Sequence, residues 1–319
     1  MTLRVLMIVV SVFACVAAYA QNYPTRAVRL VVPYAPGGGT DFTARVIAPK
    51  LSEALGQQVV VENRPGGGTN IGSDLVAKAA PDGYTLLMAG AANAINMSLY
   101  AKLPYDTVRD FLPVSLSVKG ANVLLVHPSL PVKNLRDLLA LARAQPGKLN
   151  YASSGIGSAN HMAGELLKLV AKVNIAHVPY KGNAPALTDL IGGHVEILIS
   201  GVPAVIGQIK NGRVRAIAIA SLKRFPALPD TPTNDESGLK GFEATTWFGV
   251  MAPAKTSRDI VNRLNADLAR IVTAPDVRER FIGEGVEPVG GSTELFAGFI
   301  RDEIDKYAKV VKAAGLKAE

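Results

Sequence analysis

Short apolar runs alternate along this chain with longer segments in which apolar residues recur three and four positions apart. The short runs predict strands over residues 28–32, 59–61, 84–88, 123–126, 150–152, 175–178, 195–199, 214–220 and 247–251. The longer segments predict helices over residues 40–55, 71–79, 135–144, 160–171, 185–191, 258–272, 276–284 and 293–314. Ser257 and Ser292 are candidate N-caps. Strands that alternate with helices are typical of βαβ units, so we expect an α/β protein with parallel strands.

Two strands divide this alternation into two blocks. The candidate strands 122–127 and 246–251 flank one complete α/β set, which predicts a second lobe inserted into the first. Within that second lobe, the proline-rich segment 225–241 lacks periodicity and is expected to be a loop packed on a surface. Both lobes have the ordinary size of domains. The expected boundaries are residues 21–122 and 246–319 for lobe 1 and residues 123–245 for lobe 2.

The first twenty residues predict a secretory signal peptide. The basic residue Arg4 precedes an apolar run over residues 5–18, and Ala18-Tyr19-Ala20 fits a small-residue cleavage site. A membrane anchor is one alternative, but the run is shorter than the roughly 18 to 20 apolar residues that span a bilayer. Lipid anchoring at Cys15 is another. We therefore expect an exported protein of the periplasm.

Composition excludes several kinds of chemistry. Cys15 is the only cysteine, so the mature chain would contain no disulfide, no thiolate nucleophile and no zinc-thiolate site. The net charge of +8 falls to +7 without Arg4, which leaves 33 basic and 26 acidic residues. This surplus favours attraction of anionic solutes. The basic residues are dispersed and are not interleaved with aromatic residues, so nucleic acid is not an expected partner.

A glycine-rich loop over residues 33–41 is the first candidate site. Gly37, Gly38 and Gly39 lack side chains, so their backbone N–H groups can approach a ligand, and the following helix adds the positive end of its dipole. An anion is the expected guest. Thr40 or Asp41 is expected to cap the helix, and binding of a water or a ligand hydroxyl is the alternative for Asp41. The similar run 65–70 is attributed to tight turn geometry, with a second ligand loop as the alternative.

Two further loops join strands to helices in the second block. The loop 153–158 offers hydroxyl groups, free N–H groups and a helix N-terminus, although an N-cap with turn glycines would look the same. His161 follows Ser158 by one turn, which is compatible with a base and a nucleophile but also with a structural histidine. In the run 177–186, Tyr180 and Lys181 are candidates to line a cleft, and an ordinary surface charge is the alternative for Lys181.

Motifs of cofactor, metal and catalytic sites are missing. Residues 37–42 and 155–160 break the dinucleotide pattern G-x-G-x-x-G because they end in Phe42 and Asn160. The chain has no Walker A lysine motif, no H-E-x-x-H and no G-x-S-x-G. Its histidines, at positions 127, 161, 177 and 194, lack the spacing of metal ligands. We expect no cofactor, no metal and no catalysis.

An ordered series of motifs over nearly all of the mature chain resembles one family. These motifs are Tyr23-Pro24, Val32 to Asp41, Glu62-Asn63-Arg64-Pro65-Gly66, Asn70-Ile71-Gly72, Pro81 to Leu87, Leu103 to Asp106, Pro146 to Tyr151, Gly155 to Ser158, His177 to Ala186 and Trp247-Phe248-Gly249. They resemble the substrate-binding proteins of tripartite tricarboxylate transporters, also called the Bordetella uptake gene family. The resemblance implies a periplasmic Venus-flytrap fold of type II, with a hinge of two crossing strands.

The resemblance also implies a set of ligand contacts. In that family, loops of both lobes hold carboxylates through backbone amides, hydroxyls and ordered waters. The matching positions in lobe 1 are Tyr34, Pro36, Gly37, Gly38, Gly39, Thr40, Asp41, Ala91 and Asn93. Those in lobe 2 are Ser154, Gly155, Gly157, Ser158, His161, Tyr180, Lys181, Gly182, Asn183, Ala184 and Ser200.

Two departures from the family pattern bear on the ligand. Family members often carry an acidic or amide pair where this chain has Ser200-Gly201-Val202, and the loop 90–93 is bare. Fewer acids suit a second carboxylate and disfavour an amino group. The expected function is a monomeric, non-enzymatic receptor that delivers a small carboxylate to membrane permease subunits. The alternatives are a sensor subunit for a membrane kinase and an envelope hydrolase that uses Ser158 and His161.

Overall fold

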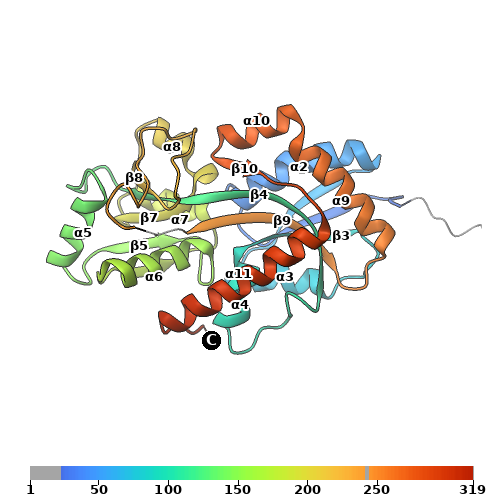
Figure 1. The fold of residues 1–319 in the computed structure, drawn as a ribbon, viewed down its shortest axis with the longest axis horizontal. Helices are drawn as coiled ribbons and strands as arrows, with labels where there is room; N and C mark the ends of the chain where they lie inside the picture. Colours follow the sequence, from blue (N-terminus) through green and yellow to red (C-terminus); the bar gives the residue numbers. More distant parts are fainter. Residues whose placement is uncertain (1–22, 241–243, 319) are drawn as a thin grey trace, which may run out of the picture.

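The computed structural model describes residues 23–240 and 244–318 and forms two lobes joined by long strands (Figure 1). The predicted signal peptide and Cys15 lie outside the described residues. The described strands form one curled sheet in the order β2-β1-β3-β9-β4-β7-β5-β6, and both β8 and β10 pair with β4. Their bounds are β1 Val28–Val32, β2 Val59–Asn63, β3 Thr85–Gly90, β4 Phe111–Val126, β5 Asn150–Ser153, β6 Ala176–Pro179, β7 Ile197–Gly201, β8 Arg215–Ile219, β9 Thr245–Pro253 and β10 Val286–Pro288.

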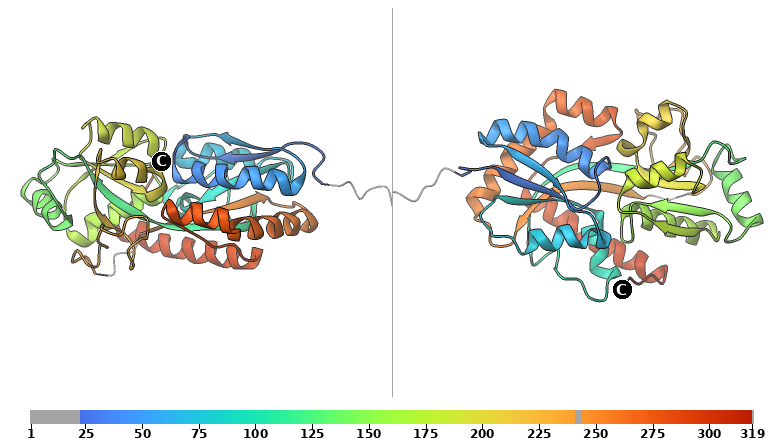
Figure 2. Two further views of the ribbon diagram at one scale, coloured as in Figure 1. Left: turned by 90° about the horizontal axis from the view of Figure 1, so that it is seen from above. Right: turned by 180° about the vertical axis from the view of Figure 1, so that it is seen from behind.

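Helices lie on both faces of these strands, as the view from above shows (Figure 2). Ser257 and Ser292 accept hydrogen bonds from the backbone N–H groups of Ile260 and Leu295, so both predicted N-caps are confirmed. No described helix combines the length and the apolar character of a membrane span. The helix bounds are α2 Gly39–Leu55, α3 Asn70–Ala77, α4 Ala91–Leu99, α5 Leu135–Ala144, α6 Ala159–Ala171, α7 Asn183–Ile191, α8 Ile206–Lys210, α9 Arg258–Thr273, α10 Pro275–Gly283 and α11 Thr293–Ala313.

Strand β4 connects the two lobes. Its first part pairs antiparallel with β9 as far as Ala121, and from Asn122 onward it pairs with β7. The parallel pairs of β1 with β2 and β3 lie on one side of this junction, and those of β5 with β6 and β7 lie on the other. The exchange of partners at Asn122 agrees with the strand predicted over 122–127. The boundaries of the two lobes stay a prediction.

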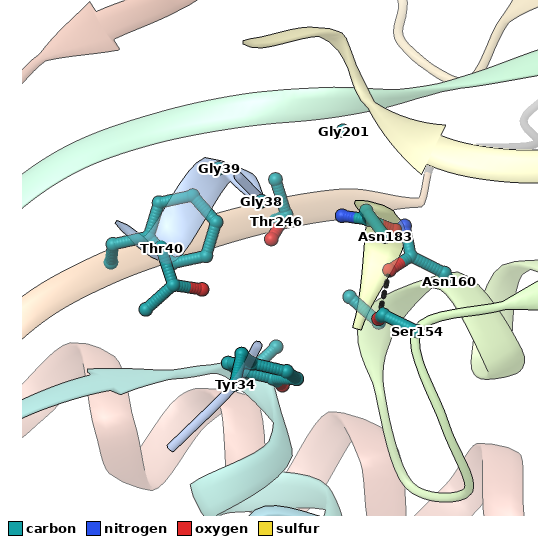
Figure 3. Close-up of a pocket in the computed structure, with 12 residues that line it drawn as sticks. Tyr34, Gly38, Gly39, Thr40, Ser154, Asn160, Asn183, Gly201 and Thr246 are labelled. Carbon is teal, nitrogen blue, oxygen red and sulfur yellow. Dashed lines mark hydrogen bonds between the residues drawn. The ribbon is translucent and has the colours of Figure 1, made fainter. Parts of the chain in front are cut away.

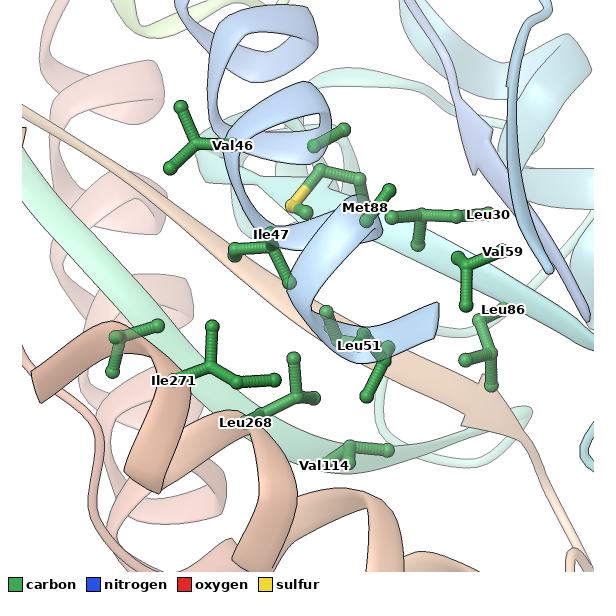
Figure 4. Packing of buried hydrophobic residues seen from close by; sticks show 14 of the residues in the cluster. Leu30, Val46, Ile47, Leu51, Val59, Leu86, Met88, Val114, Leu268 and Ile271 are labelled. Carbon is green, nitrogen blue, oxygen red and sulfur yellow. The ribbon is translucent and has the colours of Figure 1, made fainter. Parts of the chain in front are cut away.

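The core of the first lobe shows why α2 forms where it does. Ile47 and Leu51 lie one turn apart on its apolar face, and both are fully buried against Leu30 of β1, Leu86 of β3 and Leu268 of α9 (Figure 4). Burying each such side chain contributes about 1.5–3 kcal/mol of stability. Replacing Leu268 by alanine would therefore cost roughly 2–5 kcal/mol. This packing fixes the N-terminal end of α2, which faces the second lobe.

The apolar periodicity missed several elements, and its absence correctly predicted one loop. The start of α4 was expected to be a bare loop, because its alanines and asparagines show no clear apolar face; α8 and β10 were missed because they are short. The first part of β4 was missed because serines, which are buried there, interrupt its apolar run. The segment 225–240 has no helix and only one isolated bridge, and it buries Phe225 and Leu228, as predicted for a packed loop.

Candidate functional site

A cavity of about 430 Å³, including its open mouth, lies between the two lobes (Figure 3). Both sides of the molecule contribute to its wall. From the side of β1, β3 and β9 come Tyr34, Gly38, Gly39, Thr40, Ala91, Thr246 and Phe248. From the side of β5, β6 and β7 come Ser154, Ala159, Asn160, Asn183 and Gly201.

Four of the described helices begin at this cavity. The first residues of α2, α4, α6 and α7 are Gly39, Ala91, Ala159 and Asn183, and all four line the wall. The first turn of a helix has backbone N–H groups without intrahelical partners and carries the positive end of the helix dipole. Two of these ends come from each side of the cavity. Their convergence creates a positive potential that suits an anion.

The described residues of the cavity wall include no charged side chain. Tyr34 is the one ionisable residue among them, and burial raises the pKa of its hydroxyl, so the side chain is neutral. Within this set, no carboxylate is present to balance a ligand ammonium group, and no lysine or arginine is present to pair with an anion. The wall would therefore hold negative charge through backbone N–H groups and neutral polar side chains.

Asn183 brings an unpaired amide oxygen to the wall. Its Oδ1 is buried and has no hydrogen-bond partner among the described residues. Its side chain lies beside Gly38, where a Cβ added to the glycine would be 3.7 Å from Nδ2 of Asn183. In Figure 3, Asn183 and Thr246 approach the cavity from different elements. This arrangement leaves amide and hydroxyl groups to complement a polar ligand.

A chain of buried hydrogen bonds runs from the cavity to the junction of the lobes. Ser154 Oγ donates to Asn160 Oδ1 at 2.5 Å, and Asn160 Nδ2 donates to Asn122 Oδ1 at 2.7 Å. Asn122 Nδ2 then donates to the carbonyl oxygen of Ala244 at 3.0 Å. Asn122 is the residue at which β4 changes partners, so this chain fixes the wall of the cavity to the crossing strands.

Asp41 supports the glycine loop from behind and does not line the cavity. Its Oδ2 accepts from Gly37 N at 3.0 Å and from Arg45 Nε at 2.9 Å, and its Oδ1 accepts from Asn63 Nδ2 at 2.9 Å. Burial raises its pKa, but the hydrogen bonds from Arg45, Gly37 and Asn63 outweigh burial and hold the pKa below its ordinary value. Gly37 precedes α2, whose N-cap Gly38 has no side-chain hydrogen bond, so the carboxylate of Asp41 stabilises the glycine loop and does not cap the helix.

Seven of the twenty predicted site residues line this cavity. They are Tyr34, Gly38, Gly39, Thr40, Ala91, Ser154 and Asn183. Gly155, Tyr180 and Lys181 line a neighbouring cavity. Four more lie where the lobes meet, namely Pro36, Gly37, Gly182 and Ala184. Gly37 faces Ala184, Gly182 faces Ala35, and Pro36 is exposed beside Gly37. The ligand contacts of all these residues stay predictions.

The other predicted residues have contacts within the protein. Asn93 turns inward, where its Oδ1 accepts from Gly90 N and its Nδ2 donates to Ser73. Gly157 packs closely against Asn96. Ser200 is fully buried, and its hydroxyl donates to the carbonyl of Gly201. Their ligand roles also stay predictions.

Ser158 and His161 do not form a nucleophile and base pair. Ser158 Oγ accepts the backbone N–H of His161 as the N-cap of α6, and the ring Nδ1 of His161 accepts from Gly157 N. The His161 ring stacks on His177 at 4.2 Å between centroids. Burial lowers the pKa of His161 to about 4 and that of His177 to about 3. This arrangement supports the structural alternative for His161.

Five cavity residues were not among the predicted contacts: Ala159, Asn160, Gly201, Thr246 and Phe248. Asn160 lies in the first turn of α6, two residues beyond the predicted loop. Thr246 and Phe248 enter through β9, which was predicted only as a crossing strand. The Phe248 ring also explains why a glycine occupies position 39, because an added Cβ there would lie 3.1 Å from the ring. The Trp247-Phe248-Gly249 motif linked this strand to the family pattern, but no ligand role was assigned to it.

Comparison with known proteins agrees with this geometry. The family described as "Tripartite tricarboxylate transporter family receptor" matches residues 43–316. The chain is 43% identical to the "UPF0065 protein in tcbD-tcbE intergenic region" of Pseudomonas sp. (strain P51), over 93% of this chain and 88% of that protein. It is 39% identical to the protein BugT of Bordetella pertussis (strain Tohama I), over 99% of each chain.

Three solved structures share both sequence and fold with this chain. The periplasmic binding protein BugD has a TM-score of 0.90 at 37% identity and covers 93% of this chain and 100% of its own. Rpa4515 of R. palustris, solved with adipate, has a TM-score of 0.90 at 40% identity, over 92% of this chain and 99% of its own. MatC of Rhodopseudomonas palustris, solved with malate, has a TM-score of 0.87 at 34% identity, over 91% of this chain and 100% of its own.

These similarities confirm the two-lobed periplasmic binding protein fold that the sequence motifs implied. The chain therefore belongs to the tripartite tricarboxylate transporter receptor family, whose members are periplasmic solute-binding proteins.

Proposed function

We propose that this protein captures a small dicarboxylate between its two lobes and delivers it to the membrane permease subunits of a tripartite tricarboxylate-type secondary transporter. The observation that carries the proposal is the convergence of four helix N-termini on a cavity whose described lining residues carry no charge. Two relatives of similar fold were solved with dicarboxylates, adipate and malate.

The distribution of the helix ends supports two anionic groups on one ligand. Helices α2 and α4 begin on the side of lobe 1, and α6 and α7 begin on the side of lobe 2. A carboxylate at each end of a ligand would then face a pair of helix N-termini. A ligand that contacts both lobes stabilises their closed arrangement by its differential affinity for that state. An ammonium group would find no acid among the described lining residues.

Delivery to a permease requires export. The signal peptide over residues 1–20 and release into the periplasm belong to this proposal, as do the lobe boundaries and a monomeric receptor. No observation on the described part of this chain favours the sensor or the hydrolase. The partner can be tested by expressing the chain with the membrane subunits encoded beside its gene and measuring uptake of a labelled diacid. Uptake that is independent of this chain would reject the transport role.

A thermal-shift screen tests ligand capture itself. Mono-, di- and tricarboxylates, aromatic acids and nicotinate would be added to the mature protein, because a ligand that binds only the folded state raises its melting temperature. At about 100 times Kd, the ligand would add about 2.7 kcal/mol of stability. We expect the largest shifts from dicarboxylates. The absence of a shift with every acid would reject the proposed function.

A further inference from the structure

A second cavity lies beside the first. It encloses about 670 Å³, including its mouth, and is lined by the second glycine loop of lobe 1 and by Ile156, Tyr180 and Lys181 of lobe 2. Tyr34 and Ser154 line both cavities. We call them the inner and the outer cavity. The two spaces are thus neighbours separated by one aromatic ring and one small side chain.

Tyr34 is held by backbone hydrogen bonds and by packing of its side chain against the core of the first lobe. Its carbonyl oxygen accepts from Asn63 Nδ2 at 3.0 Å, and the next residue, Ala35, donates its N–H to the carbonyl oxygen of Lys181 at 3.1 Å. The ring itself projects into the space between the lobes, where Figure 3 shows it across from Thr40 and Ser154. Because its backbone is fixed, the Tyr34 side chain forms a partition between the two cavities.

The outer cavity has the charge that the inner one lacks. Among its described lining residues Lys181 is the one charged side chain, and it makes no ion pair within the described part of the chain. No acid is found among the described residues that line either cavity. The outer cavity therefore suits a second anionic group, with Lys181 as its counter-ion.

We propose that Tyr34 sets the maximum chain length of the ligand, and that the outer cavity is a carboxylate subsite which its ring separates from the inner one. On this proposal, a short diacid would bind at the inner cavity with its carboxylates at the helix N-termini. The distal carboxylate of a longer diacid would have to pass Tyr34 to reach Lys181. This inference rests on the proposed function, because it assumes that the inner cavity holds a carboxylate.

Calorimetric titration with succinate, glutarate, adipate, pimelate and suberate tests the inference. Wild type is compared with Tyr34→Ala, which removes the ring, and with Tyr34→Phe, which keeps it. We expect Tyr34→Phe to keep the wild-type order of affinities along the series. We expect Tyr34→Ala to move the preferred ligand to a longer diacid and to improve the affinity for suberate, relative to that for succinate, by about tenfold or more.

A double variant assigns the new contact. Adding Lys181→Met to Tyr34→Ala should remove most of the gain for suberate, because the distal carboxylate loses its counter-ion. A gain that survives Lys181→Met would overturn the role of Lys181, and an unchanged order of affinities in Tyr34→Ala would overturn the partition. Tyr34→Leu serves as a second variant if thermal unfolding shows that Tyr34→Ala is not folded. A wild type that binds none of the five diacids would reject the proposed function instead.

Discussion

Replacing Asp41 by asparagine removes the charge that holds the glycine loop in place. The carboxylate accepts three hydrogen bonds, from Gly37 N, Arg45 Nε and Asn63 Nδ2, and the side chain of Asp41 is almost fully buried. Asparagine is of similar size but offers one acceptor oxygen and one donor group. At least one of the three donors would then face an NH₂ group inside the protein. The substitution therefore disturbs the hydrogen bonds without opening a cavity.

The cost of Asp41→Asn follows from which bonds are buried. Arg45 is about half exposed, so solvent screening limits its pair with Asp41 to under about 1 kcal/mol. A buried donor left without a partner costs about 1–3 kcal/mol. We expect a total loss of about 2 kcal/mol. For a chain of this size, unfolding entropy converts that loss to a fall of about 3 °C in melting temperature. The freed Gly37 would also displace Gly38 and Gly39, so carboxylate affinity should fall about tenfold.

Thermal unfolding as a function of pH checks this reasoning. The pKa of Asp41 lies below its ordinary value of 3.8, so its contribution is present above pH 3.8 and is lost as the pH falls through the lower, folded-state pKa. The difference between wild type and Asp41→Asn should therefore shrink in acid. Asp267→Asn is the matched control, because Asp267 pairs with Arg263 and Arg270 on α9, away from the cavity. Equal stability and equal ligand affinity of Asp41→Asn and wild type near neutral pH would refute the role of Asp41.

Three other predictions concern the walls of the site. Acid should destabilise the protein through His161 and His177, because burial lowers their pKa values below the ordinary 6.5, to about 4 and about 3. The groups that face these two rings are Tyr151, Glu165 and Lys168. Stability should fall as the pH drops below 6.5, by about 1.4 kcal/mol per pH unit for each histidine kept neutral, and His177→Gln should flatten this slope in urea titrations. Asn160→Ala should cost about 2–3 kcal/mol in urea unfolding, because the Ser154 hydroxyl and Asn122 Oδ1 would each lose their hydrogen bond with Asn160; a cost near zero would contradict the buried chain. Gly39→Ala should reduce carboxylate affinity about tenfold in calorimetry, because its Cβ would press on Phe248 inside the cavity, and unchanged affinity would contradict this packing.

The sequence predicted the fold well wherever one segment carried its own pattern. The strand 28–32 and the helix 135–144 match β1 and α5 residue for residue, since each shows the apolar spacing of its own element. Helix α4 could not be predicted this way, because small and amide side chains fill its inner face and its burial depends on contacts with α11. The first half of β4 buries serines through pairing with β9, a partner more than a hundred residues away.

The same limit applies to the site. The glycine loop before α2 and the serine-rich loop before α6 were found because a loop that precedes a helix has a local signature. Thr246 and Phe248 were not found, since long-range strand pairing brings them to the cavity. Asn160 was not found because it lies in the first turn of α6, beyond the loop that carried the local signature. Asp41 was identified, but its partner Asn63 comes from β2, so its supporting role could only be seen in three dimensions.

The central claim is that a cavity of helix N-termini, with no acid among its described lining residues, selects a ligand with a carboxylate at each end. Adipate and 6-aminohexanoate test it most directly, because they are of nearly equal length and 6-aminohexanoate carries a CH₂–NH₃⁺ group where adipate has its second carboxylate. Calorimetric titration of the mature protein should give an affinity for adipate about 100-fold higher or more, since the ammonium group would face helix N-termini without a counter-ion. Equal or tighter binding of 6-aminohexanoate would contradict the account.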